Sequence, residues 1–157
     1  MKVATLESGQ EYKVALAKSP SAQYRAQLLI SMFGDCSPTP PRNQPSVYVI
    51  SVKEDDVFRI VGTCSIGRSN NFSSEVFHLC IHDKYRRLGL ASQLLDYAIS
   101  NSTKPFLFSN VHSSNVASRM LFERLGFEKF QTYTKVDRLG ENAEFTVYYK
   151  STRCSNE

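Results

Sequence analysis

Apolar side chains that recur every three or four residues predict three helices in this chain. The first is expected to begin at Ser19-Pro20, because a capping serine followed by proline suits the first helical turn, and to end at Gly34. The second is expected over residues 90–100. The third should follow Asn115, whose side chain can cap a helix, and end at Gly126 in a left-handed conformation.

The same spacing predicts which side of the two later helices is buried. In the second helix this side consists of Leu88, Ala91, Leu94, Leu95, Ala98 and Ile99, and in the third it consists of Ala117, Met120, Leu121 and Leu125. Gln93 and Asp96 should then face solvent.

Runs of β-branched and aromatic residues predict six strands after the first helix. They cover residues 47–52, 57–66, 75–81, 106–111, 130–136 and 143–149. The first two and the last two of these strands should form hairpins. In the first 18 residues the alternation of apolar and polar side chains is too short to decide whether they form strands. No repeat or linker interrupts this order. We therefore expect an α+β fold with a mixed, mostly antiparallel central sheet and flanking helices, as a single domain over residues 1–157.

One segment does not fit a helix or a central strand. Residues 36–45 contain Pro38, Pro40, Pro41 and Pro45. Because proline lacks a backbone donor and fixes its own φ, this segment is expected to be a surface loop, at the mouth of a site.

The bulk composition excludes several classes of protein. A hydrophobic fraction of 41% and a charged fraction of 22% are ordinary for a globular protein and argue against disordered and fibrous classes. No apolar run is long enough to span a membrane, and the first residues do not resemble a secretory signal. We expect an intracellular protein, cytoplasmic by default, with the nucleus left open.

The net charge and the cysteine content limit the ligands and metal sites that we expect. The net charge of +4 is far below that of a typical nucleic-acid-binding domain but suits a polyphosphate ligand. The four cysteines are scattered without a Cys-x-x-Cys pair, so no metal site and no disulfide framework is expected. Cys64 and Cys80 lie in apolar runs, where buried free thiols are expected.

The first motif with chemical content is Arg86-Arg87-Leu88-Gly89-Leu90-Ala91, between a predicted strand and a predicted helix. A glycine-containing basic turn before a helix suits an anion, because the first helical N–H groups and the positive end of the helix dipole point toward it. Two arginines add charge and forked donors. By itself the turn is common, and a loop with solvated arginines explains it equally well.

A second motif favours the anion-binding interpretation of this turn over a loop with solvated arginines. It runs from Asn115 through Ala117, Leu121 and Phe122 to Gly126-Phe127. Together and in this order, the two motifs resemble the GCN5-related N-acetyltransferase (GNAT) superfamily. Its signatures are Arg/Gln-x-x-Gly-x-Gly/Ala and a later Asn-initiated helix that ends in Gly-Phe. The resemblance covers residues 47–149 and implies the acyl-CoA N-acyltransferase fold, with acetyl-CoA as co-substrate, no metal and an amine as acceptor.

The resemblance also assigns residues to the cofactor. They are Leu79, Cys80, Ile81, Arg86, Arg87, Leu88, Gly89, Leu90, Ala91, Ser92, Asn115, Ser118 and Phe122. Backbone N–H groups of residues 87–92 would hold the pyrophosphate, with Arg86 or Arg87 reaching the phosphates. Residues 79–81 would pair with the pantetheine amides like an added strand. Asn115 would contact the cofactor arm, a role compatible with capping its helix.

In the implied reaction the amine attacks the thioester directly, without an acyl-enzyme. Glu75 is the candidate base, because it lies 11 residues before Arg86 on the preceding strand, where several family members place a glutamate. Strand alternation predicts Glu75, Phe77, Leu79 and Ile81 on one face, and apolar neighbours could raise the pKa of this carboxyl. The alternative is an exposed glutamate at the start of its strand.

The sequence does not identify the general acid that would protonate the leaving thiolate. The family places a tyrosine where this chain has Phe122, which carries no hydroxyl. The remaining candidates are Tyr133, Tyr148, Cys80, His82, His112 and solvent. A catalytically weak acyl-CoA-binding sensor or partner module is therefore the alternative function. The acceptor, a small molecule or a protein amino group, is undetermined, and exposed strand edges in the last hairpin suit a homodimer.

Overall fold

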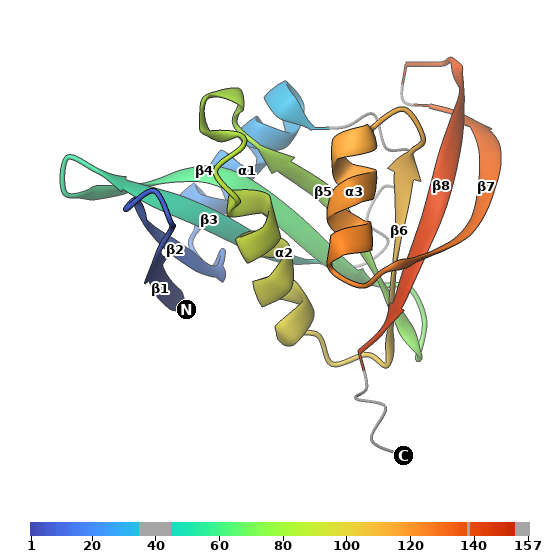
Figure 1. Cartoon of the computed structure of the whole chain (residues 1–157), viewed down its shortest axis with the longest axis horizontal. Coiled ribbons are helices and arrows are strands. Elements are labelled where there is room, and N and C mark those ends of the chain that lie inside the picture. The colour runs from blue at the N-terminus through green and yellow to red at the C-terminus, as the bar shows by residue number, and fades with distance from the viewer. Residues whose placement is uncertain (35–44, 138, 153–157) are drawn as a thin grey trace. The chain divides into compact units, whose positions relative to one another are not determined.

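The computed structural model describes residues 1–34, 45–137 and 139–152, and within them it contains eight strands and three α-helices (Figure 1). In chain order these elements are β1 (Lys2–Thr5), β2 (Glu11–Leu16), α1 (Pro20–Phe33), β3 (Ser46–Glu54), β4 (Val57–Arg68), β5 (Ser73–Ile81), the 3-10 turn η1 (Asp83–Tyr85), α2 (Leu90–Ser100), β6 (Phe106–His112), α3 (Val116–Arg124), β7 (Glu128–Val136) and β8 (Asn142–Ser151). The three predicted helices and six predicted strands are all present. The undecided N-terminal residues form β1 and β2.

The strands are hydrogen-bonded in the order β1-β2-β3-β4-β5-β6-β8-β7. β5 and β6 run parallel, whereas β1–β2, β2–β3, β6–β8 and β7–β8 are antiparallel. The predicted mixed, mostly antiparallel sheet is confirmed. The described residues fall into two compact units, one of residues 1–34, 46–65 and 78–98 and the other of residues 45, 66–77, 99–137 and 139–152. That the whole chain is a single domain stays a prediction.

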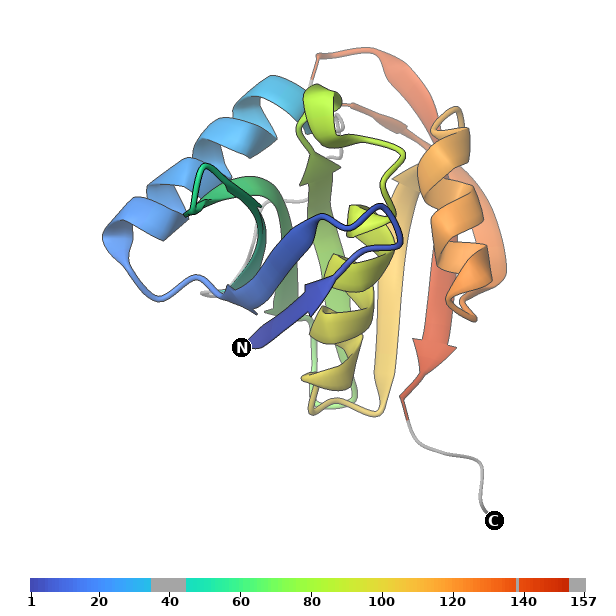
Figure 2. The same ribbon diagram turned by 60° about the vertical axis from the view of Figure 1, so that its left-hand side comes forward.

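The first unit is held together by α1 and the strands beside it (Figure 2). Ala26 of α1 is fully buried and packs with Ala17 and Val49, and one turn further along Leu29 and Ile30 pack with Cys80. Burial of such side chains contributes on the order of 1.5–3 kcal/mol for each large aliphatic group. Ala26, Leu29 and Ile30 lie three or four residues apart or adjacent in sequence, so α1 buries one face.

The second unit is built on β6, β8 and β7, with α3 alongside (Figure 1). Tyr148 of β8 is fully buried; its ring stacks on Phe122 of α3, and its hydroxyl donates to Glu123 at 2.9 Å. The β7–β8 register shifts between Lys129 and Gln131, as expected for a β-bulge. Arg119 Nε of α3 also donates to this hydroxyl, at 3.2 Å, so one aromatic contact and two hydrogen bonds join α3 to β8 through Tyr148.

Local start and stop signals behave as the sequence predicts. Ser19 caps α1 by accepting a hydrogen bond from the N–H of Ala22 at 3.1 Å, and Asn115 caps α3 in the same way through Ser118. Gly126 has a φ of 87°, and the following Phe127 is buried against Phe122 with ring centroids 4.9 Å apart. These short-range interactions fix both helix boundaries.

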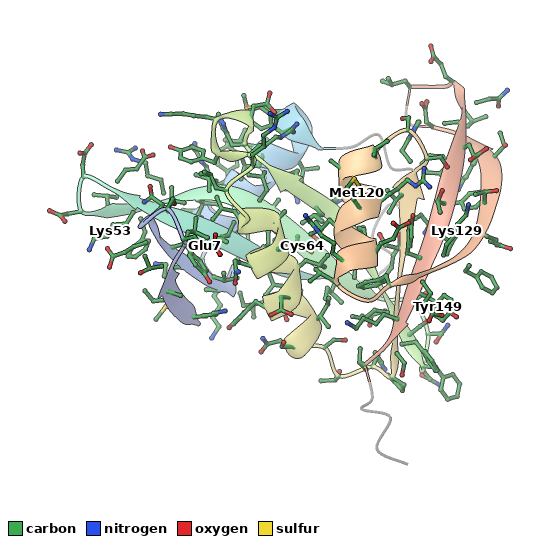
Figure 3. The ribbon with its side chains drawn as sticks, in the orientation of Figure 1. Glu7, Lys53, Cys64, Met120, Lys129 and Tyr149 are labelled. Carbon is green, nitrogen blue, oxygen red and sulfur yellow. The ribbon has the colours of Figure 1, made fainter. Side chains whose placement is uncertain are left out.

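The predicted apolar faces of α2 and α3 are partly wrong. Leu88 lies before α2 and is 39% exposed, while Leu90 is buried instead. In α3, Met120 is 54% exposed and Phe122 is 2% exposed (Figure 3 labels Met120 on its helix). In a helix of only nine residues, one residue more or less in the pattern rotates the predicted stripe by about 100°.

Two further predictions concern the cysteines and the proline-rich loop. Cys64 and Cys80 are free and buried, as expected. Most of the predicted loop over residues 36–45 lies outside the described residues, as do Cys36 and Cys154. Within the described ranges, no helix combines the length and the apolar character needed to cross a bilayer.

Candidate functional site

The basic turn between β5 and α2 has an unusual backbone. Arg87 has a φ of 65° and Gly89 a φ of 83°, so two of three consecutive residues are left-handed. Such conformations are costly for a residue with a side chain and occur where neighbouring N–H groups converge on an anion. A Cβ added at Gly89 would meet no atom within 4 Å, so this turn is open rather than packed.

The N-terminus of α2 follows directly. The N–H of Gln93 donates to the carbonyl of Gly89 at 3.2 Å, which makes that bond the first of the helix. The N–H groups of residues 90–92 precede it and have no acceptor within the helix. With the helix dipole they form an arrangement that can hold a phosphate, and the predicted binding of the CoA pyrophosphate here stays a prediction.

The two arginines of the turn have different surroundings. Arg86 forms an ion pair with Asp83 at 3.0 Å, and its Nε donates to the carbonyl of Ile81 at 3.1 Å. Arg87 has an exposed side chain on a left-handed residue. Arg86 therefore stabilises the turn itself, and the carbonyl of Ile81, which was expected to face the cofactor, already accepts a hydrogen bond.

β5 changes its pairing before it reaches this turn. Among the described residues, the parallel ladder joins only residues 73–75 of β5 to residues 106–108 of β6, although both strands continue. The carbonyl of Val76 accepts instead from the side chain of Ser109 at 2.8 Å. His78 then has a φ of 51°, which interrupts the alternation of the strand. The predicted common face of Glu75, Phe77, Leu79 and Ile81 therefore does not hold beyond His78.

Glu75 is a buried side chain. It is 9% exposed, and Asn110 Nδ2 donates to its Oε2 at 3.3 Å. The alternative of an exposed glutamate at the start of the strand is therefore wrong. Tyr133 lies on the far side of Asn110, and its hydroxyl donates to Asn110 Oδ1 at 2.8 Å. Sequence reasoning missed Asn110, because a single asparagine in a strand carries no signal of its partners.

Among the candidate proton donors, several are already engaged. Tyr148 donates to Glu123 and accepts from Arg119 Nε at 3.2 Å. Burial raises the pKa of the Cys80 thiol to about 12. His82 Nδ1 accepts from the N–H of Lys84 at 3.1 Å, which uses one of its ring nitrogens. The hydrogen bonds of Tyr148 and His82 and the packing of Cys80 in the core give each of the three groups a structural role.

His112 is engaged much as His82 is, whereas Tyr133 is linked to Glu75. His112 Nδ1 lies 2.6 Å from the hydroxyl of Ser114, and its ring contacts Phe145. Burial, followed by the charge of Glu75, raises the pKa of Tyr133. Of the hydroxyl and imidazole candidates, Tyr133 is the one that the structure links to Glu75, through Asn110.

The helix that carries Asn115, Ser118 and Phe122 shows structural roles for all three. Asn115 Oδ1 accepts from the N–H of Ser118 at 3.1 Å, and Phe122 is buried between Phe127 and Tyr148. Their contacts to a cofactor stay predictions. Among the described residues, no group of three or more His, Cys, Asp or Glu side chains is placed to hold a metal ion.

Comparison with solved structures identifies the fold. Similar structures include an N-acetyltransferase from Staphylococcus aureus Mu50, with 16% identity, a TM-score of 0.71 and coverage of 90% of this chain and 99% of that chain. A candidate acetyltransferase from Salmonella typhimurium, yncA, solved with its cofactor acetyl-CoA, has 18% identity, a TM-score of 0.71 and coverage of 93% and 96%. The ribosomal-protein-S18-alanine N-acetyltransferase from Escherichia coli has 14% identity, a TM-score of 0.70 and coverage of 93% and 97%. The expected acyl-CoA N-acyltransferase fold is confirmed.

Comparison of the sequence gives the family. No match was found among curated proteins. A sequence profile of the acetyltransferase (GNAT) domain matches residues 45–129, which is more than half of the chain and includes both motifs. The chain therefore belongs to the GNAT family of acetyltransferases.

Proposed function

We propose that the protein transfers an acetyl group directly from acetyl-CoA to a primary amine, on a small molecule or on a protein. The observation that supports this most is on β5, which carries the buried carboxylate of Glu75 and leads into the left-handed basic turn. A carboxylate can take a proton from an ammonium, and the turn followed by a helix N-terminus can hold a pyrophosphate.

In the proposed reaction the ammonium gives one proton to Glu75, and the neutral amine attacks the thioester carbonyl. The C–N bond forms and the C–S bond breaks; the nitrogen loses a second proton, and the CoA thiolate takes one up. Backbone N–H groups of residues 79–81 are the proposed donors to the carbonyl oxygen as it gains charge. Acetyl-CoA supplies the activated acyl group.

Direct transfer agrees with the state of the described thiols. Burial raises the pKa of both Cys64 and Cys80 to about 12. A thiol acts as a nucleophile only as its thiolate, which is scarce at neutral pH for such a group. This argues against either cysteine as the carrier of an acyl-enzyme intermediate.

The test is thiol release from acetyl-CoA with a panel of small amines and peptides with free N-termini. We expect Glu75→Gln to lower kcat/KM by about 10²–10⁴-fold while CoA affinity is kept. Glu128→Gln is the matched control, because Glu128 also accepts a hydrogen bond, from Tyr149 at 2.6 Å, but lies exposed on β7. Equal rates for Glu75→Gln and the wild type would remove Glu75 as the base.

A second function has one specific observation in its favour. Phe122 occupies the position where the family has a tyrosine, and it is buried between two aromatic rings. A protein without an efficient acid could bind acyl-CoA as a sensor or partner module. CoA binding without turnover across the whole panel would favour this alternative over the acetyltransferase.

A further inference from the structure

A hydrogen-bonded chain of three side chains crosses three strands of the second unit. Asn110 on β6 donates through Nδ2 to Glu75 Oε2 on β5 at 3.3 Å, and accepts through Oδ1 from the hydroxyl of Tyr133 on β7 at 2.8 Å. The ring of Tyr133 stacks on Phe145 of β8, with centroids 5.6 Å apart and planes 25° apart. Phe145 is fully buried, so the tyrosine ring is fixed on one side.

Chemistry fixes the direction of every bond in this chain. An ionised carboxylate only accepts hydrogen bonds, so the amide nitrogen of Asn110 must face Glu75. The amide oxygen then faces Tyr133, and because an amide oxygen cannot donate, the hydroxyl proton of Tyr133 must point at it. The reversed amide would place two oxygen acceptors against each other. While Glu75 is charged, the whole chain therefore has one orientation.

This orientation decides what Tyr133 can offer to a ligand. Its proton is used by Asn110, so in this state the hydroxyl is poorly placed to protonate a leaving thiolate. Its oxygen keeps lone pairs that can accept an N–H. Burial and the charge of Glu75 raise the pKa of Tyr133, which keeps the hydroxyl neutral at physiological pH.

From this geometry we infer that Glu75 and the Tyr133 oxygen together bind the ammonium group of the acceptor, and that Asn110 is a positioning residue that orients both acceptors. The inference rests on the proposed function, whose acceptor it describes as a primary ammonium. Such a group carries three N–H donors, so it can donate to both oxygens and still present its nitrogen after one proton is lost. Tyr133 is then a substrate-binding residue and not the general acid.

A simpler role for the three side chains would be to cross-link the strands. The two roles differ in the pH dependence of the reaction. Asn110→Asp would place a second carboxylate beside Glu75, and a like charge raises the pKa of the pair. The acidic limb of the kcat/KM profile should then move to higher pH by about one unit or more. If all three side chains, Glu75 included, only cross-linked the strands, the rate would fall at every pH and the limb would not move.

Steady-state kinetics of the wild type and three variants test the inference with the best amine of the panel. Tyr133→Phe should raise KM for the amine by about tenfold with kcat within about threefold, because one acceptor for the bound ammonium is lost. Asn110→Asp should shift the acidic limb. Tyr149→Phe is the matched control, since it removes another hydrogen-bonded tyrosine hydroxyl, which donates to Glu128 rather than to Asn110, and it should leave both parameters unchanged.

The outcomes separate the two claims. Turnover by the wild type, with a normal amine KM in Tyr133→Phe and an unmoved limb in Asn110→Asp, would overturn this inference and leave the proposed function standing. No turnover with any amine would overturn the proposed function, and this inference with it. Turnover with both expected changes supports the two together.

A measurement that does not need activity checks the arrangement itself. With ¹³C-labelled tyrosine, an NMR titration of the wild type should give Tyr133 a pKa above its ordinary value, and Glu75→Gln should lower that pKa because the nearby charge is removed. Tyr149, whose pKa is raised by donation to Glu128, should not respond to Glu75→Gln. An ordinary pKa for Tyr133 in the wild type would mean that its hydroxyl is neither buried nor near a charged Glu75, which would contradict this arrangement.

Discussion

At the scale of single residues, substitutions at two glycines can distinguish a loss of ligand binding from a loss of folding stability. Gly89 in the basic turn has a φ of 83° and Gly140 in the β7–β8 turn has a φ of 82°, and an added Cβ would meet no atom within 4 Å at either position. A side chain at either place therefore costs a similar strain, roughly 1–2 kcal/mol, with no steric clash. Only Gly89 lies where we propose that the pyrophosphate binds.

We predict that Gly89→Glu lowers CoA affinity by at least about tenfold, because a carboxylate then faces the bound anion near the helix N-terminus. Gly140→Glu should bind CoA like the wild type and lose about as much thermal stability as Gly89→Glu. Isothermal titration with CoA and a thermal melt of each variant measure both effects. Normal CoA affinity in Gly89→Glu would contradict the phosphate role of the turn.

Which site residues could be predicted depends on how local their signal is. The caps at Ser19 and Asn115 and the left-handed Gly126 were predictable, because each acts within about one helical turn. The left-handed conformations of His78 and Arg87 were not, because residues with side chains rarely adopt them and their sequence gives no signal. The contact between Glu75 and Asn110 joins residues 35 apart and depends on strand pairing.

At the scale of elements, the buried face of α3 differs in part from the predicted one, because Leu121 is buried as predicted but Met120 is exposed. Phe122 lies between Phe127 and Tyr148, with ring centroids at 4.9 Å and 6.1 Å, whereas Met120 is 54% exposed. The sequence predicts the length of this helix well but not its rotation, since small and polar residues flank the few apolar ones. The burial of Phe122 also indicates that this side chain has a packing role.

We predict that Phe122→Ala lowers the free energy of unfolding by roughly 3–5 kcal/mol, because it leaves a cavity between two aromatic rings. Met120→Ala, on the same helix, should change it by less than about 0.5 kcal/mol. Urea unfolding followed by circular dichroism measures both. If the two variants were equally stable, α3 would not pack through the face described above.

At the scale of the whole molecule, the order of the strands in the sheet could not be predicted from the pattern of apolar and polar residues. Alternation and turns predicted the hairpins β3–β4 and β7–β8, but not that β6 pairs with β5 on one side and β8 on the other. Non-local pairing depends on complementary surfaces rather than on local spacing. β7 is the last strand in this order and is exposed along most of its length. An exposed edge strand can pair with a second copy of the chain, and the predicted homodimer through this edge stays a prediction.

From the pKa values of titrating groups in both units we also predict how the stability of the whole molecule changes at alkaline pH. Among the described residues, the acids with a raised pKa include Tyr48, Cys64, Cys80, Tyr85, Tyr133 and Tyr149. For Cys64 burial raises the pKa from 9.0 to about 12. Below the lower value both the folded and the unfolded thiol keep their proton, so stability is full. Between the two values the unfolded chain alone loses it, so stability falls as pH rises.

We therefore expect the urea midpoint to drop clearly between about pH 8 and about pH 10.5, well before Cys64 ionises in the folded state. Cys64→Ala removes one of the responsible groups and should make this drop smaller, even where it lowers the midpoint at neutral pH. A surface cause would affect the wild type and Cys64→Ala equally. A midpoint that stays constant over this range would mean that the buried thiols do not differ in pKa between the folded and unfolded states.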